Sequence, residues 1–155
     1  MKPVSVSIEV PQPREEVFDF LDVLANHEQF NDHFLVDWEV IAPARGVGAK
    51  ARMRVKRVGS DDPLEMEVVD AERPRMTVEE SVSGKGRRRT RGTYLLDELP
   101  SGGTRITFEL AWLEAPLSER LAAPLARWVV RRANARSLQR LGETLNANHG
   151  REKRS

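Results

Sequence analysis

Residues 26–34, which read NHEQFNDHF, gather side chains that could transfer protons or bind a metal ion. Histidine titrates near neutral pH, so His27 or His33 could act as a general acid or base. A zinc site normally needs three or four ligands at helical or knuckle spacing, and two histidines six positions apart do not supply them. No serine lies in a nucleophile-elbow pattern. We therefore assign no catalytic residue and no metal site, and we expect no cofactor.

Aromatic side chains are the second chemical feature of this region. Phe30, Phe34 and Trp38 follow a short amphipathic run and lead into an alternating segment. Rings at this place could wall a pocket for an apolar molecule, or they could simply pack in the core. We predict that residues 26–34 form the rim of a pocket, with Phe30 and Phe34 facing inward while the histidines and amides satisfy turns.

Glu80 is the acid whose position suggests a role inside a pocket. If Met76 and Val78 face inward, a period of two sends Glu80 inward as well, and a three-residue GKG turn would set it opposite Thr90. A buried carboxylate is costly unless it is paired, so Glu80 could, with Tyr94, anchor the polar end of a ligand. Alternatively this end of the hairpin lies outside the core, and Glu80 is a solvated partner of Arg88. The sequence leaves both interpretations open.

Methionines are expected on the inner faces of three neighbouring strands, at Met53, Met66 and Met76. Their flexible thioethers suit an adaptable pocket, although filling gaps in a core is their commoner role. Together with Phe108 and Trp112 they predict a lining that is more apolar than ionic. A ligand bound there would be hydrophobic.

The composition indicates one globular domain. Of the 155 residues, 39% are apolar and 32% are charged, which is typical of a chain with one hydrophobic core. No stretch approaches the ~18 apolar residues of a membrane span, and the N-terminus alternates instead of supplying a signal peptide. The absence of cysteine excludes thiolate chemistry and fits a reducing compartment. We expect a cytoplasmic protein with no transmembrane insertion, whose domain covers 1–145 and whose polar tail, 146–155, frays.

Alternation of apolar and polar residues predicts seven strands. Short turns between the later strands predict antiparallel hairpins, and a single apolar face predicts a sheet with one buried side. Apolar residues at steps of three and four between Val17 and Leu24 predict a short helix after the first strand. The predicted strands cover 4–10, 35–42, 49–58, 64–72, 75–83, 88–99 and 104–113.

A long helix is predicted over about 118–145, with Ser118 as N-cap and an end at Asn146 or Gly150. Its apolar residues form two stripes that point in roughly opposite directions, and a straight helix cannot bury both against one sheet. Pro124 offers a place for a kink or a restart. We predict that the later stripe packs into the sheet, and that the earlier one covers a cavity mouth or meets a partner, a second copy in a homodimer included. The earlier stripe is Leu121, Leu125 and Trp128, and the later one is Val130, Leu138, Leu141 and Leu145.

Several segments resemble one known family in a shared order. NHEQFNDHF resembles the YPEWNP region that follows the short helices of START-like (SRPBCC) proteins of the polyketide cyclase/dehydrase type, with Glu28, Phe30 and Asn31 at matching places. Asp32 stands where that family usually has proline. RGVGAKARMRV resembles its GVG and following strand, while ERPRMTVEESVSG, YLLDELPSGGTRITFEL and APLSERLAAPLARWVVRR resemble its later strands, its Gly-Thr-Arg hairpin and the start of its final helix. The similarity covers about 3–145.

This resemblance implies an α+β helix-grip fold, in which a curved antiparallel seven-stranded sheet wraps a long C-terminal helix and short helices follow the first strand. It also implies a cavity for a hydrophobic small molecule or lipid. Relatives include carriers, receptors and cyclases, so the fold does not decide the activity. We expect binding or transport of such a ligand, with a polyketide cyclase/dehydratase-like enzyme using a histidine, Glu80 or Tyr94 as the alternative. The predicted ligand-binding residues are Phe30, Phe34, Trp38, Met53, Met66, Met76, Val78, Glu80, Tyr94, Phe108, Trp112, Leu125 and Val129.

A third function class is an interaction module built on the arginine-rich segment 84–92, GKGRRRTRG. Such a tip can be a solubilising edge that discourages strand association, or it can dock on RNA, an acidic partner or anionic headgroups. The arginines of the C-terminal helix are spread around it without an aromatic stacking platform. A net charge of only +1 supplies no global attraction, so nucleic acid is not the expected partner.

Overall fold

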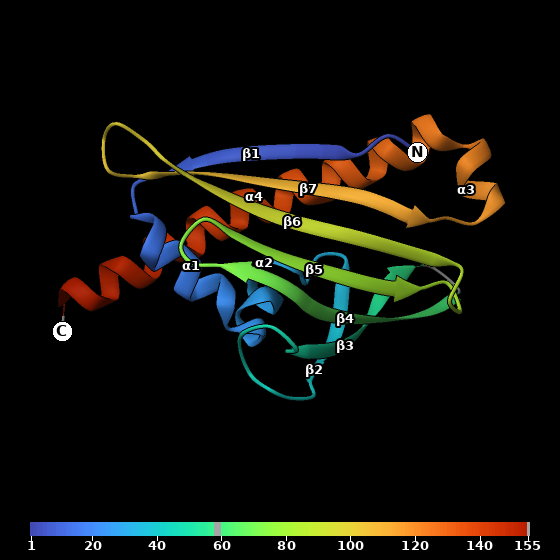
Figure 1. Ribbon diagram of the computed structural model, residues 1–155, viewed down its shortest axis with the longest axis horizontal. Coiled ribbons are helices and arrows are strands. Elements are labelled where there is room, and N and C mark those ends of the chain that lie inside the picture. The colour runs from blue at the N-terminus through green and yellow to red at the C-terminus, as the bar shows by residue number, and fades with distance from the viewer. Residues whose placement is uncertain (58–59, 155) are drawn as a thin grey trace.

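One antiparallel sheet curves around one long helix, which Figure 1 shows behind the sheet, running from α3 toward the C-terminus. The computed structural model describes residues 1–57 and 60–154, so the predicted strand end at residue 58 and the last residue of the tail lie outside the described residues. The elements are β1 (Val4–Val10), α1 (Arg14–Asp22), the 3-10 turn η1 (Leu24–His27), α2 (Glu28–Asn31), β2 (Leu35–Val40), β3 (Lys50–Arg57), β4 (Ser60–Glu72), β5 (Met76–Ser83), β6 (Arg88–Glu98), β7 (Thr104–Glu114), α3 (Leu117–Leu121) and α4 (Ala123–Arg154).

The strand order β1-β7-β6-β5-β4-β3-β2 follows from the lengths of the connections. Short loops keep β2 to β7 next to one another, and every pair is antiparallel. The helical segment after β1 is long enough to carry the chain across to the far edge of the sheet, which leaves β1 to pair with β7. The predicted α+β helix-grip fold is therefore confirmed, with its seven strands, its short helices after β1 and its long C-terminal helix.

Two groups of buried apolar side chains fill the concave side of the sheet. The first packs the second half of α4 against β1, β6 and β7, and it includes Leu138, Leu141 and Leu145. The second lies between β2, β3 and β4 and includes Met53. The prediction that the later stripe of the long helix packs into the sheet is confirmed for its last three residues.

The C-terminal helix begins twice, as the position of Pro124 predicted. The helix α3 ends just before Ala122 and α4 begins just after it. Pro124 therefore lies in the first turn of α4, where a backbone N–H would have no partner within the helix. The predicted end at Asn146 or Gly150 is wrong, because α4 continues to Arg154. Strong helix formers surround both residues, and they outweigh the weak stop signals.

The start and the outer face of this helix pair also differ from the prediction. The residue before the first turn of α3 is Pro116, so Ser118 is not the N-cap. Leu121, Leu125 and Trp128 are all exposed. The prediction that this stripe covers the cavity is therefore wrong for Leu121 and Trp128, while Leu125 borders the cavity and still remains 62% exposed. Within residues 1–57 and 60–154, no helix is both long and apolar enough to cross a membrane.

The turn between β5 and β6 is one residue longer than the GKG turn expected from the sequence. Ser83 pairs with Arg88, which leaves residues 84–87 in the turn. Gly84 and Gly86 have φ angles of 61° and 86°, a left-handed backbone that glycine adopts without steric cost. One extra residue in a turn exchanges the two faces of the strand that precedes it.

The consequence is that β5 turns its other face to the concave side. Glu79 pairs with Gly92 and is buried, whereas Glu80 receives hydrogen bonds from the Arg91 guanidinium, with Nη2 2.7 Å from Oε1. The predicted inward orientation of Met76, Val78 and Glu80 is therefore wrong. Met76 and Val78, which suggested it, alternate with the polar residues that line the cavity, and Val78 is buried without reaching it.

Gly92 leaves space for the side chains of Phe108 and Glu79, which lie against its backbone. A Cβ atom on this residue would lie 2.7 Å from Cζ of Phe108 and 3.2 Å from Cγ of Glu79. We expect Gly92→Ala to lower the free energy of unfolding in urea by about 1–3 kcal/mol, because the ring must shift. Gly150→Ala is the control, since a Cβ there meets open space. Equal stability of the two variants would contradict the prediction.

Candidate functional site

A cavity of about 550 Å³ lies between the concave face of the sheet and α4. It borders α4 from Leu125 to Leu138, which corresponds to about 20 Å of helix. Small-molecule sites commonly enclose ~300–1,000 Å³, so this cavity is large enough for an elongated organic molecule. Its apolar wall includes Leu35, Val55, Leu64, Met66, Phe108 and Leu110.

The structure brings about half of the predicted ligand-binding residues together around this cavity. Those that line it come from the α2–β2 corner, from β4, β6 and β7, and from the first turns of α4. Their contact with a ligand remains a prediction. They are Phe34, Met66, Tyr94, Phe108, Trp112, Leu125 and Val129.

The remaining predicted residues lie elsewhere. Phe30 faces inward but is completely buried against the rings of Phe20 and His27. Met53 is a core residue, and Trp38 packs beside it while its indole Nε1 donates to the Leu35 carbonyl at 3.0 Å. Met76, Val78 and Glu80 do not line the cavity, because the register of β5 turns the alternate residues toward it.

Glu79 is the acid that the fold places in the cavity. Its side chain is only 11% exposed, and the structure gives it no cation within hydrogen-bond distance among the described residues. Burial raises the pKa of Glu79 to about 8, because the ionised form would lose its hydration without compensation. At neutral pH the carboxyl group is thus mostly protonated and can donate a hydrogen bond.

His27 lies directly behind Glu79. Its Nε2 is 2.7 Å from the carbonyl oxygen of Leu21 and donates to it, which leaves Nδ1 as the acceptor. Nδ1 is buried, has no hydrogen-bond partner among residues 1–57 and 60–154, and lies 3.8 Å from Oε2 of Glu79. Burial lowers the pKa of His27 to about 4, so the ring is neutral. The two groups form a buried, uncharged acid–base pair.

Three further polar side chains complete this end of the cavity. Burial, with a smaller contribution from Glu79, raises the pKa of Tyr94 well above its usual value, so the phenol keeps its proton. Asn31 lies beside the Tyr94 hydroxyl, and the amide nitrogen of Asn134 is buried without a hydrogen-bond partner in the part of the chain that the structure describes. All three line the cavity. This end therefore presents neutral hydrogen-bond donors within an apolar wall.

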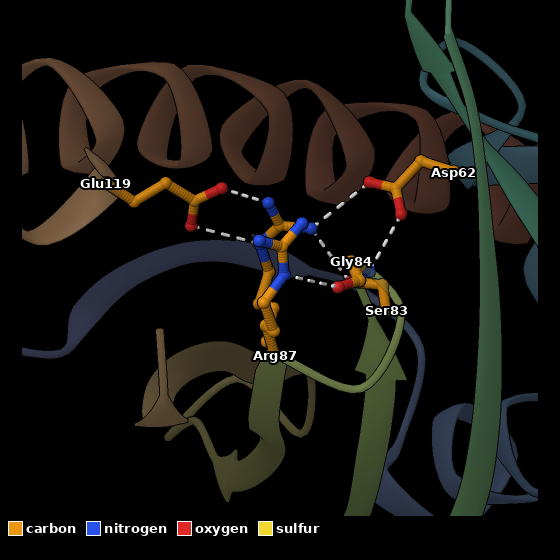
Figure 2. A network of polar contacts seen from close by, with 6 residues as sticks. Asp62, Ser83, Gly84, Arg87 and Glu119 are labelled. Atoms are coloured by element: carbon orange, nitrogen blue, oxygen red, sulfur yellow. Dashed lines mark hydrogen bonds and ion pairs between the residues drawn. The ribbon is translucent and has the colours of Figure 1, made fainter. Parts of the chain in front are cut away.

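Arg88 closes the other end of the cavity. Figure 2 shows the polar network at this end, with Asp62, Ser83 and Glu119 labelled. Arg88 Nε donates to Glu119 Oε2 at 3.0 Å, and its Nη2 bonds the second oxygen of the same carboxylate. Its Nη1 donates to Asp62 Oδ2 at 3.1 Å and to Ser83 Oγ at 2.9 Å. The hydrogen bond to Glu119, together with the negative charges of Glu119 and Asp62, raises the pKa of Arg88, so the guanidinium stays charged. The network ties α3 to β4 and to the β5–β6 hairpin.

His33 fastens the α2–β2 corner to α4. Its Nε2 donates to the Ala133 carbonyl at 3.0 Å, and its Nδ1 accepts from Arg140 Nη1 at 3.0 Å. Asp32 forms an ion pair with the same arginine. Burial lowers the pKa of His33, so the neutral ring fits this role. His27 and His33 are held by carbonyl groups of different elements and do not converge on one point.

Sequence reasoning missed Glu79, Asn134 and the cluster around Arg88. Glu79 was passed over because Met76 and Val78 set the predicted inner face of the strand. A signal was present, since Thr77, Glu79, Ser81 and Ser83 alternate as one polar series, the pattern expected of a strand that borders a cavity. No local pattern could indicate the Arg88 cluster, whose members come from four separate segments.

A separate cluster lies on the surface near the end of α4. Ligand-type atoms of Glu16, His149 and Glu152 lie within 4.8 Å of one another, and His149 Nδ1 is 3.6 Å from Glu16 Oε1. Two carboxylates and one imidazole at a surface are common in proteins that bind no metal. We assign no metal to them.

Comparisons with known proteins agree with this architecture. A family model described as "Polyketide cyclase / dehydrase and lipid transport" matches residues 1–146. No curated protein matches the sequence. Among solved structures, TTHA0849 from Thermus thermophilus is 21% identical, with a TM-score of 0.73 over 95% of this chain and 99% of that one.

Two further structures share the fold at lower identity. The Zhui aromatase/cyclase from Streptomyces sp. R1128 is 14% identical, with a TM-score of 0.70 over 94% of this chain and 93% of that one. Ara h 8.0201 is 11% identical, with a TM-score of 0.69 over 94% of this chain and 98% of that one. At these identities the likeness shows the fold.

Proposed function

Because the chain belongs to the polyketide cyclase/dehydrase and lipid transport family, we propose that it binds a hydrophobic small molecule or lipid between the sheet and α4. One observation carries the proposal: a cavity of about 550 Å³ has a mainly apolar wall and a few neutral polar groups at one end. Sites for apolar ligands have this composition, in which the wall supplies contact area and the polar groups fix orientation.

The polar end also defines the chemistry of the bound molecule. Protonated Glu79 can donate a hydrogen bond, and Asn134 has a buried amide N–H to which no described residue offers an acceptor. A buried unsatisfied donor costs about 1–3 kcal/mol, which a ligand can recover by accepting its hydrogen bond. We infer a ligand with an elongated apolar body and an uncharged oxygen acceptor, such as a carbonyl or hydroxyl group, at one end.

Filling the cavity should abolish binding. Ala133 lines the cavity from α4, and tryptophan at this position would occupy part of the space a ligand needs. With the fluorescent probe 1-anilinonaphthalene-8-sulfonate, Ala133→Trp is expected to bind at least about tenfold more weakly than the parent protein, since it loses apolar contact area. Native mass spectrometry of the parent protein from its own host would then identify the retained molecule.

The matched control is Ala135→Trp, which adds the same side chain at an exposed position two residues further along α4. It should leave probe binding and the melting temperature unchanged. Ala126→Trp provides a second cavity-filling variant, in case Ala133→Trp unfolds the protein. Undiminished probe binding by a folded cavity-filling variant would contradict the proposal.

A cyclase or dehydratase activity is the second candidate, and the Glu79–Tyr94 pair favours it. Both groups line one cavity and both are protonated at neutral pH, so either could donate a proton to a carbonyl oxygen of a bound substrate. If so, a poly-β-ketone analogue should lose water when incubated with the parent protein, as followed by mass spectrometry, and should not do so with Glu79→Gln. Binding of the analogue without turnover would leave only the binding function.

A further inference from the structure

An apolar surface occupies the corner where α3 meets α4. Leu117, Leu121, Leu125, Trp128 and Val129 are between 51% and 79% exposed, and we call these five residues the corner patch. In Figure 1 this corner lies at one end of the molecule, beside the N-terminus. Large apolar side chains gathered on one exposed surface usually mark a site of interaction.

The fold does not explain why these positions are apolar. Along α4, Leu125, Trp128 and Val129 share one face by their spacing of three and four, and the opposite face carries the buried Leu138 and Leu141. A polar residue would satisfy the fold at each of the exposed positions. Leu125 and Val129 also border the cavity, so the corner patch continues into its wall.

Positive charge surrounds the corner patch. From residue 117 to residue 132 the chain has four arginines and one acid, Glu119, which already binds Arg88. Arg120, Arg131 and Arg132 are exposed, and the guanidinium of Arg132 lies 5.5 Å from the ring centre of Trp128. Exposed tryptophan and leucine flanked by arginine is the composition of helices that lie in the interface of an anionic bilayer.

We propose that the corner patch docks the protein on the surface of an anionic phospholipid membrane. The leucines and Trp128 would enter the boundary between headgroups and acyl chains, while the arginines contact phosphate and carboxylate groups. A second copy of the chain fits this surface less well, because a two-fold contact would bring the arginines of both copies together. Docking in this position turns the cavity border at Leu125 and Val129 toward the bilayer.

Vesicle flotation of the full chain tests the proposal. We expect binding to vesicles of phosphatidylcholine mixed with phosphatidylserine, weak binding to phosphatidylcholine alone, and loss of binding as salt rises. The double variant Leu121→Ser/Trp128→Ser should lose binding to both. Arg131→Glu/Arg132→Glu should bind anionic vesicles at least about 25-fold more weakly, since each arginine near such a surface contributes roughly fivefold.

The controls match each variant in exposure and chemistry. Val47→Ser removes an apolar side chain that is 59% exposed in the β2–β3 loop, and Arg151→Glu reverses an exposed charge near the far end of α4. Both should bind vesicles as the parent does. Sedimentation velocity at several protein concentrations completes the test.

Three results would overturn the proposal. The first is no binding of the parent to anionic vesicles, and the second is unchanged binding by both corner variants. The third is a dimer that the leucine–tryptophan variant dissociates while vesicle binding is absent, because a second copy would then cover the corner patch. Ala133→Trp, which fills the cavity, should bind vesicles as the parent does, so loss of vesicle docking and loss of cavity binding are distinguishable.

Discussion

Replacing Glu79 with glutamine should flatten the pH dependence of stability and raise the free energy of unfolding above pH 7. In the folded protein burial raises the pKa of Glu79 to about 8, from 4.5 in an exposed chain. Between these two values the unfolded state has lost the proton and the folded state keeps it. Stability therefore falls as pH rises through this window, by about 1.4 kcal/mol per pH unit.

His27 has the opposite effect over part of the same range. Its pKa falls from 6.5 to about 4 on folding, so the unfolded state binds an extra proton between these values and stability rises with pH. From pH 4.5 to 6.5 the two contributions oppose each other. From pH 6.5 to 8 only Glu79 acts, and it should lower the free energy of unfolding by about 2 kcal/mol in total.

Urea unfolding followed by tryptophan fluorescence between pH 6 and 9 measures this effect. The parent should lose stability between pH 6.5 and 8 and level off at higher pH, and Glu79→Gln should show no such loss. Glu80→Gln is a closely matched control, because it makes the same change one residue away on the outer face, where Arg91 pairs with the carboxylate. Parallel curves for the parent and Glu79→Gln would show that the Glu79 carboxyl is not held neutral by the fold.

Replacing Arg88 with methionine should destabilise the protein by about 2–4 kcal/mol and loosen α3. The change removes the cation that lies between the carboxylates of Asp62 and Glu119, which are 10% and 22% exposed. Removing one member of a buried ion network leaves the opposite charges poorly solvated, which destabilises the folded state. Because Glu119 is the contact of α3 with Arg88, amide protons in α3 should then exchange faster.

Arg89→Met is the control, since Arg89 is the next residue along β6 and points to solvent. Its effect on the free energy of unfolding should stay within about 0.5 kcal/mol. Amide hydrogen exchange read by mass spectrometry separates the local loss at α3 from global unfolding. If Arg88→Met and Arg89→Met had the same free energy of unfolding, the network in Figure 2 would not contribute to stability.

The sequence predicted most of the fold because each strand alternates and each connection has its own turn chemistry. The predicted strands agree with the observed ones to within a few residues, as for 104–113 and β7. The start of β4 was predicted too late, because Asp61, Asp62 and Pro63 suggest a turn, yet all three pair with β3. Pairing with a neighbouring strand overrides the local preference of these residues.

The site was harder to predict. It depends on which alternate residues of a strand face the concave side, and on contacts between segments that are far apart in the sequence. A single extra residue in the 84–87 turn exchanged Glu79 for Glu80, and a bulge in β4 between Val68 and Asp70 adds a second shift. No pattern within a single strand contains this information. The same limit explains Phe30 and Trp38, whose aromatic character predicted apolar packing but could not distinguish the core from the cavity wall.

The two neighbouring glutamates of β5 give the protein an unusual form of adaptability. Backbone length in a solvent-facing loop decides which of the two carboxyl groups faces the cavity and which one faces water. A natural insertion or deletion of one residue in that loop would therefore change which side chains of β5 face the cavity, without a substitution in β5 itself. Homologues that differ only in hairpin length are accordingly expected to differ in the molecules they accept.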